Sequence, residues 1–418
     1  MTMPGLFLLE CRVRIVVAGL LFAFLASPGF AQSVASPPPL PVTASSVPMV
    51  WHADVLSSAA VLSLTEADHA VRWLLPAAAR DTGATSKLIR ALEVVGFDIP
   101  VAVFFVSLNH DLGHTVRASE LGTPAHVRLV GSPWSLHPFY LWSETYPRWW
   151  GPALFDLGME SSGFEASWLL KDRTEERVLR HGSVPFGEAV TLLVAAMDTP
   201  LYAAARLGPA RDVGSGGPQG DMVNYVYQLQ EERWMAGGRG DDYDLRAAIR
   251  GKSFLNLIDL SLWSDVASVG AWLTRGDESR PLSWLRIGSI GLIPSMRYSL
   301  TPIGPEFSVR SHFRKGQALG SAYVRWSERI GNAKQNGAGV TYSAPVFRGL
   351  ESTIRFDAWS HTLRGSGVRG EISVAKRGWP NRYVGVSATV GAKSSGYLAG
   401  YPLARSTYGA VGLNIAVR

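Results

Sequence analysis

The sequence predicts an α+β protein in which an N-terminal all-helical domain precedes a C-terminal antiparallel β-barrel of about eight strands. Apolar residues recur at helical spacing up to residue 280 and at every second position from residue 283 onward. The charge changes at the same place. Residues 283–418 carry 18 basic and 5 acidic side chains, a net charge of +13, which leaves −7 for the remainder with its 22 basic and 29 acidic side chains. We therefore expect the two parts to meet different surroundings.

The first 31 residues have the order of a secretory signal peptide. Arg12 and Arg14 precede an apolar stretch at 15–26, and Gly29-Phe30-Ala31 supplies a small-x-small cleavage site. The single cysteine, Cys11, lies inside this segment, so any zinc site in the exported part must be built from His, Asp and Glu. We expect a location in the cell envelope, either the outer membrane or the periplasm.

Residues 32–50, with prolines at 37, 38, 39 and 41, read as an extended linker. The helical domain follows from 51 to 280, and its helical segments are separated by Gly- and Pro-rich stretches. Ser63 and Glu66 have the spacing of a capping box, which predicts the start of a helix. The other segments with helical periodicity are 86–95, 164–181, 187–206, 221–236 and 245–272. Their apolar runs are interrupted by charges, which favours core helices over membrane spans.

The barrel domain, 283–418, contains about seven to nine strand-like runs. Segments 336–344 and 383–391, for example, alternate apolar with small or polar residues. This pattern is typical of an outer-membrane barrel whose apolar residues face lipid, and a soluble barrel gives nearly the same alternation. The basic charge of this part predicts outer-membrane lipid or lipopolysaccharide as a partner. Because the chain is expected to be exported, we expect no nucleic-acid partner.

The most informative motif is His110-Asp111-Leu112-Gly113-His114, at the end of the apolar run 101–108. Histidines four residues apart project from one face of a helix, so both imidazoles can reach one metal ion. Asp111 stands directly after the first histidine, where a general base would lie. The same spacing also occurs by chance on ordinary helix faces.

The stretch 109–122 resembles the active-site helix of zincin metallopeptidases, which carry His-Glu-x-x-His. This resemblance implies that His110 and His114 bind zinc and that Asp111 accepts a proton from the attacking water. It also implies hydrolysis of a peptide or amide bond, with an envelope peptide or protein as the substrate. Asp111 departs from the family pattern, because Asp is one methylene shorter than Glu and reaches less far toward the water.

A zincin needs a third protein ligand, which leaves the fourth position to water. We expect Glu165 in this role, because Gly163 precedes it and a helix is predicted to begin there. Glu160 and Glu120 are the neighbouring alternatives, and the helix dipole alone would also favour an acid at 165. Asp198 interrupts the apolar run 190–197. It could orient a ligand histidine through a hydrogen bond, or begin a turn at Thr199-Pro200.

Two other interpretations remain open. HD-domain phosphohydrolases carry adjacent His-Asp on a helix, and the motif resembles them too. That resemblance implies a metal site made of His110, Asp111, an earlier His69 and a later Asp198. It explains Asp111 directly, but such enzymes mostly act on cytoplasmic nucleotides. The other interpretation is an outer-membrane barrel protein that does not catalyse a reaction and keeps a vestigial metal site.

Overall fold

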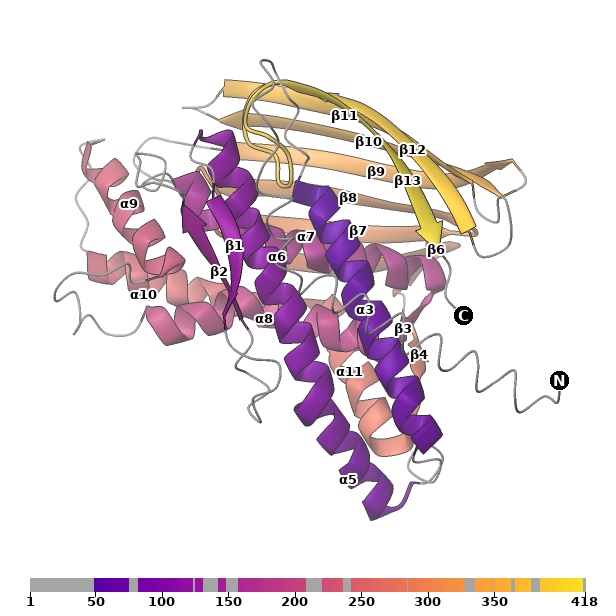
Figure 1. The fold of residues 1–418 in the computed structure, drawn as a ribbon. Coiled ribbons are helices and arrows are strands. Elements are labelled where there is room, and N and C mark those ends of the chain that lie inside the picture. The colour runs from indigo at the N-terminus through magenta and orange to yellow at the C-terminus, as the bar shows by residue number, and fades with distance from the viewer. Residues whose placement is uncertain are drawn as a thin grey trace.

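The computed structural model combines a bundle of helices with one large antiparallel sheet (Figure 1). It describes residues 49–74, 82–122, 125–130, 142–147, 157–207, 220–235, 242–283, 285–327, 335–347, 349–361, 365–376 and 384–415. The signal peptide and nearly all of the linker lie outside these residues. The helical elements are α3 (Met49–Leu74), α5 (Ala84–Glu93), the π-helical η1 (Val94–Asp98), α6 (Ile99–Glu120), α7 (Leu157–His181), α8 (Phe186–Arg206), α9 (Asp221–Met235), α10 (Asp242–Ser253), the 3₁₀-helical η3 (Phe254–Ile258) and α11 (Leu260–Arg275).

The helical segments predicted from periodicity are present, but the helical region differs from the prediction in three ways. Ser63 and Glu66 lie inside α3 rather than at a helix start. The predicted helix 245–272 is divided by η3, after which Asp259 caps α11 by accepting a hydrogen bond from the backbone N–H of Ser261. The region is also not all-helical. It contains a hairpin of β1 (Ala125–Val130) with β2 (Trp142–Pro147), and β3 (Ser183–Pro185) pairs with β4 (Ser279–Pro281).

The C-terminal part is an antiparallel sheet of 9 strands, in which each strand pairs with its neighbour in the chain. The strands are β5 (Leu285–Ile287), β6 (Ile290–Ser299), β7 (Glu306–Lys315), β8 (Ala318–Ser327), β9 (Gln335–Phe347), β10 (Leu350–His361), β11 (Gly365–Lys376), β12 (Val384–Lys393) and β13 (Ser406–Ile415). Residues 336–344 fall in β9 and residues 384–391 fall in β12, as predicted. The prediction of a closed barrel is wrong, because β13 and β5 are the two edges of the described sheet.

The inner face of the sheet is occupied by helix α7. Asp172 of α7 pairs with Arg297 of β6 and Arg310 of β7, at 3.3 and 3.0 Å. One turn further on, Glu176 pairs with Arg355 of β10 at 3.4 Å. The polar face of the strands therefore packs on carboxylates of α7, and the sheet curves over the helices without closing (Figure 1). Alternation of period two is identical in an open sheet and a closed one, so the pattern could not separate them.

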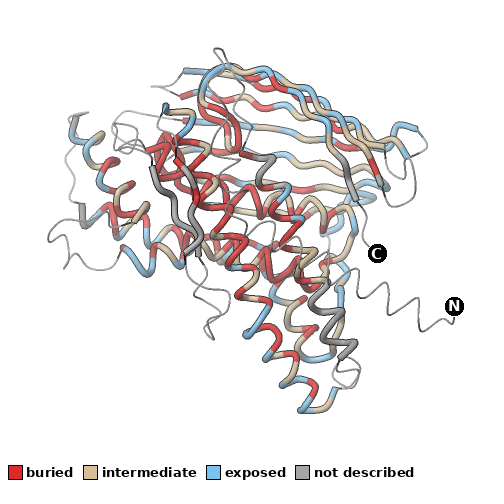
Figure 2. Tube along the Cα trace, in the orientation of Figure 1, coloured by how far each residue is buried: buried red, intermediate tan, exposed pale blue. Residues whose placement is uncertain are grey.

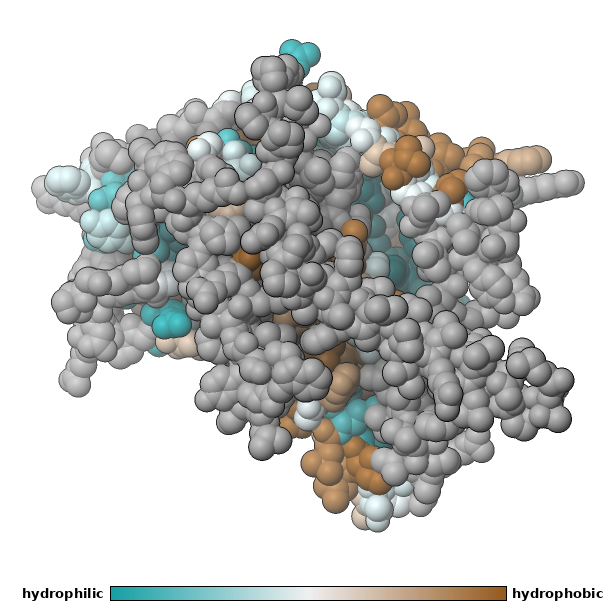
Figure 3. Space-filling model, viewed as in Figure 1, coloured by the Kyte–Doolittle hydropathy of each residue, from teal (hydrophilic) through white to brown (hydrophobic). Residues whose placement is uncertain are grey.

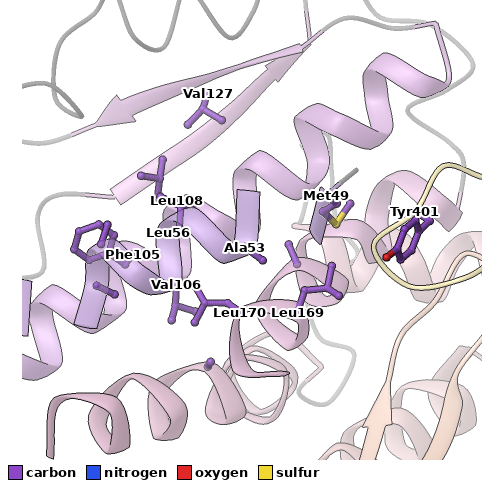
Figure 4. Close-up of a cluster of buried hydrophobic side chains, with 14 of the residues drawn as sticks. Met49, Ala53, Leu56, Phe105, Val106, Leu108, Val127, Leu169, Leu170 and Tyr401 are labelled. Carbon is purple, nitrogen blue, oxygen red and sulfur yellow. The ribbon is translucent and has the colours of Figure 1, made fainter. Parts of the chain in front are cut away.

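Helix α6 lies at the centre of the helical part and packs against α3, α7 and α8. Figure 2 shows buried residues concentrated along these central helices. Around α6, one apolar cluster joins Met49 of α3, Phe105 and Val106 of α6, and Leu169 of α7 (Figure 4). Tyr401, from the connection between β12 and β13, reaches the same cluster. The hydrophobic core therefore fixes α6 and α7 side by side and ties both to the end of the sheet.

The continuous helix formed by α5, η1 and α6 passes the length and composition test for a membrane span. Among the described residues, Ala84–Glu120 is the one stretch that does, and 50% of its most apolar window is buried inside the protein. A core helix of a globular protein passes the same test. The burial of Phe104, Phe105 and Val106 against other helices agrees with a core position for α6, whereas Leu88 and Leu92 of α5 and Val95 of η1 are exposed.

Candidate metal centre

Two glycines allow the histidine helix to approach α7 closely. A Cβ on Gly113 of α6 would lie 2.7 Å from the Cβ of Ala166, and closer still to the backbone oxygen of Ser162. A Cβ on Gly163 of α7 would lie 2.6 Å from Cε1 of His110 and nearer yet to Nε2. Both values are far inside van der Waals contact. The imidazole of His110 therefore occupies the space that any larger residue at 163 would fill.

Each histidine is oriented through its Nδ1 atom. His110 Nδ1 donates to Asp198 Oδ2 of α8 at 3.1 Å, and His114 Nδ1 donates to the backbone oxygen of Met159 at 2.7 Å. A carbonyl oxygen only accepts, so the neutral His114 ring holds its proton on Nδ1, whereas His110 has a carboxylate at each ring nitrogen, with Asp221 Oδ2 3.2 Å from its Nε2. With a proton on each Nδ1, both Nε2 atoms would offer a lone pair to a metal, as in metal sites where a carboxylate or carbonyl orients the ligand histidine. Helix α8 continues past Pro200 to Arg206, so Asp198 lies inside a helix and begins no turn.

The two Nε2 atoms converge on one carboxylate oxygen. Asp221, the first residue of α9, places Oδ2 at 3.2 Å from His110 Nε2 and 3.3 Å from His114 Nε2. These three ligand atoms lie within 4.8 Å of one another, so the group could hold a metal ion. His114 Nε2 is buried and has no hydrogen-bond partner in suitable geometry. Three acceptors that face one another need a cation between them, either protons or a metal.

The electrostatics of the site reflect the same need for positive charge. Burial alone would lower the pKa of both histidines, but Asp198 and Asp221 outweigh it for His110, and Asp221 does so for His114. Both pKa values therefore lie above the usual 6.5. Burial would raise the pKa of Asp221, yet the two imidazoles hold it well below its usual range. Without a metal, this cluster takes up protons, and a divalent cation would replace them.

Two further polar side chains border the three ligands. Glu160 of α7 is 6% exposed and accepts a hydrogen bond from Asn224 of α9 at 3.4 Å. Burial, and then the charge of Asp221, raise the pKa of Glu160 to about 8, while His114 opposes the rise. Tyr202 of α8 stacks on the His110 ring, and its hydroxyl lies 3.4 Å from Asp221 Oδ2. Burial and Asp221 raise the pKa of Tyr202, so its phenol stays protonated at neutral pH.

The structure places Glu165, the expected third ligand, outside this group. Both of its carboxylate oxygens accept from Arg117 Nη2, at 3.2 and 3.0 Å, and Oε1 also accepts from the backbone N–H of Gly400 at 2.7 Å. Glu120, one of the alternatives, is bound to the same Arg117. Glu165 therefore neutralises a buried guanidinium, and Asp221 stands where a third ligand was expected.

Asp111 and the residues of the HD interpretation are also apart from the three converging atoms. Asp111 is buried on α6, and its charge contributes to the raised pKa of His114, but it is not one of the grouped ligands. Asp198 lies on the Nδ1 side of His110, away from the shared Nε2 side. His69 falls in α3, and its side chain lies outside the described residues.

Sequence reasoning missed Asp221 as a ligand. The available signal was an acid at the first position of the predicted helix 221–236, where the helix dipole favours a carboxylate. That signal is common to many helices, and here 107 residues separate it from His114 in the chain. No protein-family model, curated protein or solved structure matches this chain. The assignment of a function therefore depends on the side chains themselves.

Proposed function

We propose that this chain is a zinc-dependent hydrolase that cleaves a peptide or amide bond in the cell envelope. The observation that carries the proposal is the convergence of His110 Nε2, His114 Nε2 and Asp221 Oδ2, with both Nδ1 atoms held by other acceptors. Two imidazoles and one carboxylate form a ligand set that suits catalytic zinc, and three protein ligands leave a fourth position for water or substrate. When bound, zinc would polarise a carbonyl group and lower the pKa of water toward neutrality.

Access to the site supports a catalytic role. The side chains of His110 and His114 are 9% and 4% exposed, whereas that of Asp221 is 31% exposed. The centre therefore lies at the boundary of the core, with its carboxylate ligand toward solvent. A substrate would approach from the Asp221 side, where Tyr202 also stands.

Glu160 is the residue that we assign as the general base. It projects from α7, the helix that faces the two histidines, and it lies close enough to Asp221 and His114 for their charges to act on it. The zincin resemblance implies Asp111 as the general base, and the side chain of Glu160 is one methylene longer than that of Asp111. Without a metal, a pKa of about 8 keeps Glu160 protonated at neutral pH, and the charge of a bound zinc ion would lower that pKa and favour the carboxylate. Glu160 would then accept the proton of the attacking water, and the protonated Tyr202 would donate a hydrogen bond to the developing oxyanion.

Metal analysis of purified variants tests the centre without any substrate. We expect one zinc per wild-type chain, and no stoichiometric zinc in His110→Ala, His114→Ala or Asp221→Asn. Asp111→Asn and Glu160→Gln should keep their zinc. Loss of metal in Asp111→Asn would favour the HD-type site instead, and a wild-type protein that binds no metal would reject every metal-dependent function.

The catalytic assignment needs a separate measurement. Cleavage of a mixed peptide library, followed by mass spectrometry, should be lost in Glu160→Gln and retained in Asp111→Asn, with zinc bound in both. The opposite pattern would return the role of base to Asp111. Zinc at full occupancy with no cleavage by the wild type would identify a metal site that does not catalyse peptide hydrolysis.

A further inference from the structure

The outer face of the sheet has the polarity that is normally found inside a protein. Along each strand the side chains that point away from the helices are apolar and exposed, as for Val324 of β8, Phe356 of β10 and Val390 of β12, which are 52%, 50% and 65% exposed. The register places these positions next to one another. Phe356 lies opposite Val340, and Ile372 lies between Ile354 and Val390. Together they form a continuous apolar surface that crosses at least five strands.

The opposite face of the same strands is charged. Between the exposed Ile354 and Phe356 stands Arg355, which pairs with Glu176 of α7 and with Glu371 of β11. Antiparallel sheets normally place apolar residues on the covered face and polar residues toward water. This sheet has the inverse arrangement, because its covered face is held by ion pairs. An exposed apolar surface of this extent marks a site of interaction.

Two lysines lie at one end of this surface. Lys315 closes β7 and Lys376 closes β11, and each shares a face with an exposed valine of its own strand, Val309 and Val374. The register puts Lys315 opposite Ala318, and Lys376 opposite Leu350 and Val386, which are strand ends on the same side of the sheet. Phe347, at 68% exposed, lies at this end as well. Figure 3 shows apolar side chains at the exposed margin of the sheet.

We infer that the outer face of the sheet docks onto a lipid bilayer, with its apolar side chains in the hydrocarbon and its basic end among anionic headgroups. The shape of the sheet favours lipid over a second copy of the chain. Because the sheet curves toward the helices, its outer face is convex (Figure 1), and two rigid convex faces touch only along a narrow strip. Fluid hydrocarbon follows such a surface over its whole area. Basic side chains beside an apolar surface strengthen attachment to anionic lipid.

Vesicle flotation of the full chain tests this inference. The wild type should float with phosphatidylcholine vesicles, and more strongly when phosphatidylglycerol is added. In Val324→Glu/Val390→Glu the partition coefficient should fall by about 100-fold, at about tenfold for each valine withdrawn from hydrocarbon. The matched control is Val55→Glu, an equally exposed valine on α3 at 63%, which should float as the wild type does. Lys315→Glu/Lys376→Glu should lose only the preference for phosphatidylglycerol.

Several results would overturn the inference. One is a wild type that stays unbound to both kinds of vesicle. Another is unchanged flotation of Val324→Glu/Val390→Glu, which would assign membrane attachment to another part of the chain. A lipid-free dimer that Val390→Glu dissociates, seen by light scattering, would assign the surface to a second copy. Circular dichroism and zinc content equal to the wild type would show that a variant has kept its fold.

Discussion

The contact between Gly163 and the His110 ring gives the sharpest test of the metal centre. In Gly163→Ala the new methyl would lie 2.6 Å from Cε1 of His110. Carbon atoms rest at about 3.5–4.0 Å, so the ring has to move by about 1 Å. Helix α7 cannot easily yield instead, because Arg117 binds Glu165 and Asn109 donates to the backbone oxygen of Ala166 at 2.6 Å.

A displaced His110 loses its alignment with Asp221, and we expect zinc affinity to fall about 100-fold, which corresponds to about 2.7 kcal/mol. The free energy of unfolding should change less than the free energy of zinc binding. Overpacking costs about 1–3 kcal/mol, and the better helix propensity of Ala offsets about 1 kcal/mol of this. Metal affinity is measured by competition with a chromogenic chelator, and the free energy of unfolding by chemical denaturation.

Gly270→Ala in α11 is the control, because an added Cβ there meets nothing within 4 Å. It should leave zinc affinity unchanged and should stabilise the helix slightly. Wild-type zinc affinity in Gly163→Ala would refute the reasoning, because it would mean that His110 does not hold the metal in the position described.

Three more predictions follow from other contacts. Asp198→Asn should weaken zinc binding about 10–100-fold while leaving one zinc per chain at saturation, as a chelator titration would show. Glu165→Gln leaves Arg117 buried without its main partner, so the free energy of unfolding should fall by about 3 kcal/mol while zinc stays at one per chain; zinc loss would restore Glu165 as a ligand. Burial raises the pKa of Glu188 to about 7 against the opposing Arg177, from an ordinary 4.5. Neutral Glu188 therefore stabilises the fold below pH 4.5, and this contribution to the free energy of unfolding, about 3 kcal/mol at most, is lost as the pH rises through 7. In Glu188→Gln, the free energy of unfolding from denaturation at several pH values should depend less on pH.

The sequence was informative wherever a local pattern determines a local structure. The spacing of His110 and His114 placed both imidazoles on one face of a helix, and the switch to period two located the strands. Asp221 could not be found in this way, because its position depends on how α9 packs against α7 and α8. Glu165 was misleading for the same reason. An acid in the first turns of a predicted helix has no fixed partner until a buried Arg117 is brought beside it.

The open sheet is a similar case. Alternation along β10 told which side chains share a face, and it said nothing about what covers that face. Asp172 and Glu176 on α7 decide this, because they offer carboxylates to Arg297, Arg310 and Arg355. Read alone, helix α7 is an ordinary helix with charges in its second half. Pairing between two distant charged surfaces leaves no periodic trace in either segment.

The hydrogen bond from Gly400 to Glu165 has a consequence for how the protein matures. It joins residues 235 positions apart, and it comes from the connection between the last two strands. Contacts at such separation form late, because the intervening chain must first be ordered. During synthesis the histidine helix is complete long before Gly400 exists, yet the Arg117–Glu165 pair beside it stays uncovered until the final hairpin arrives. A chain cut short before residue 400 would keep its histidines and the Arg117–Glu165 pair, and it would lose the hydrogen bond from Gly400 and the packing of Tyr401 that cover this pair and the neighbouring apolar cluster.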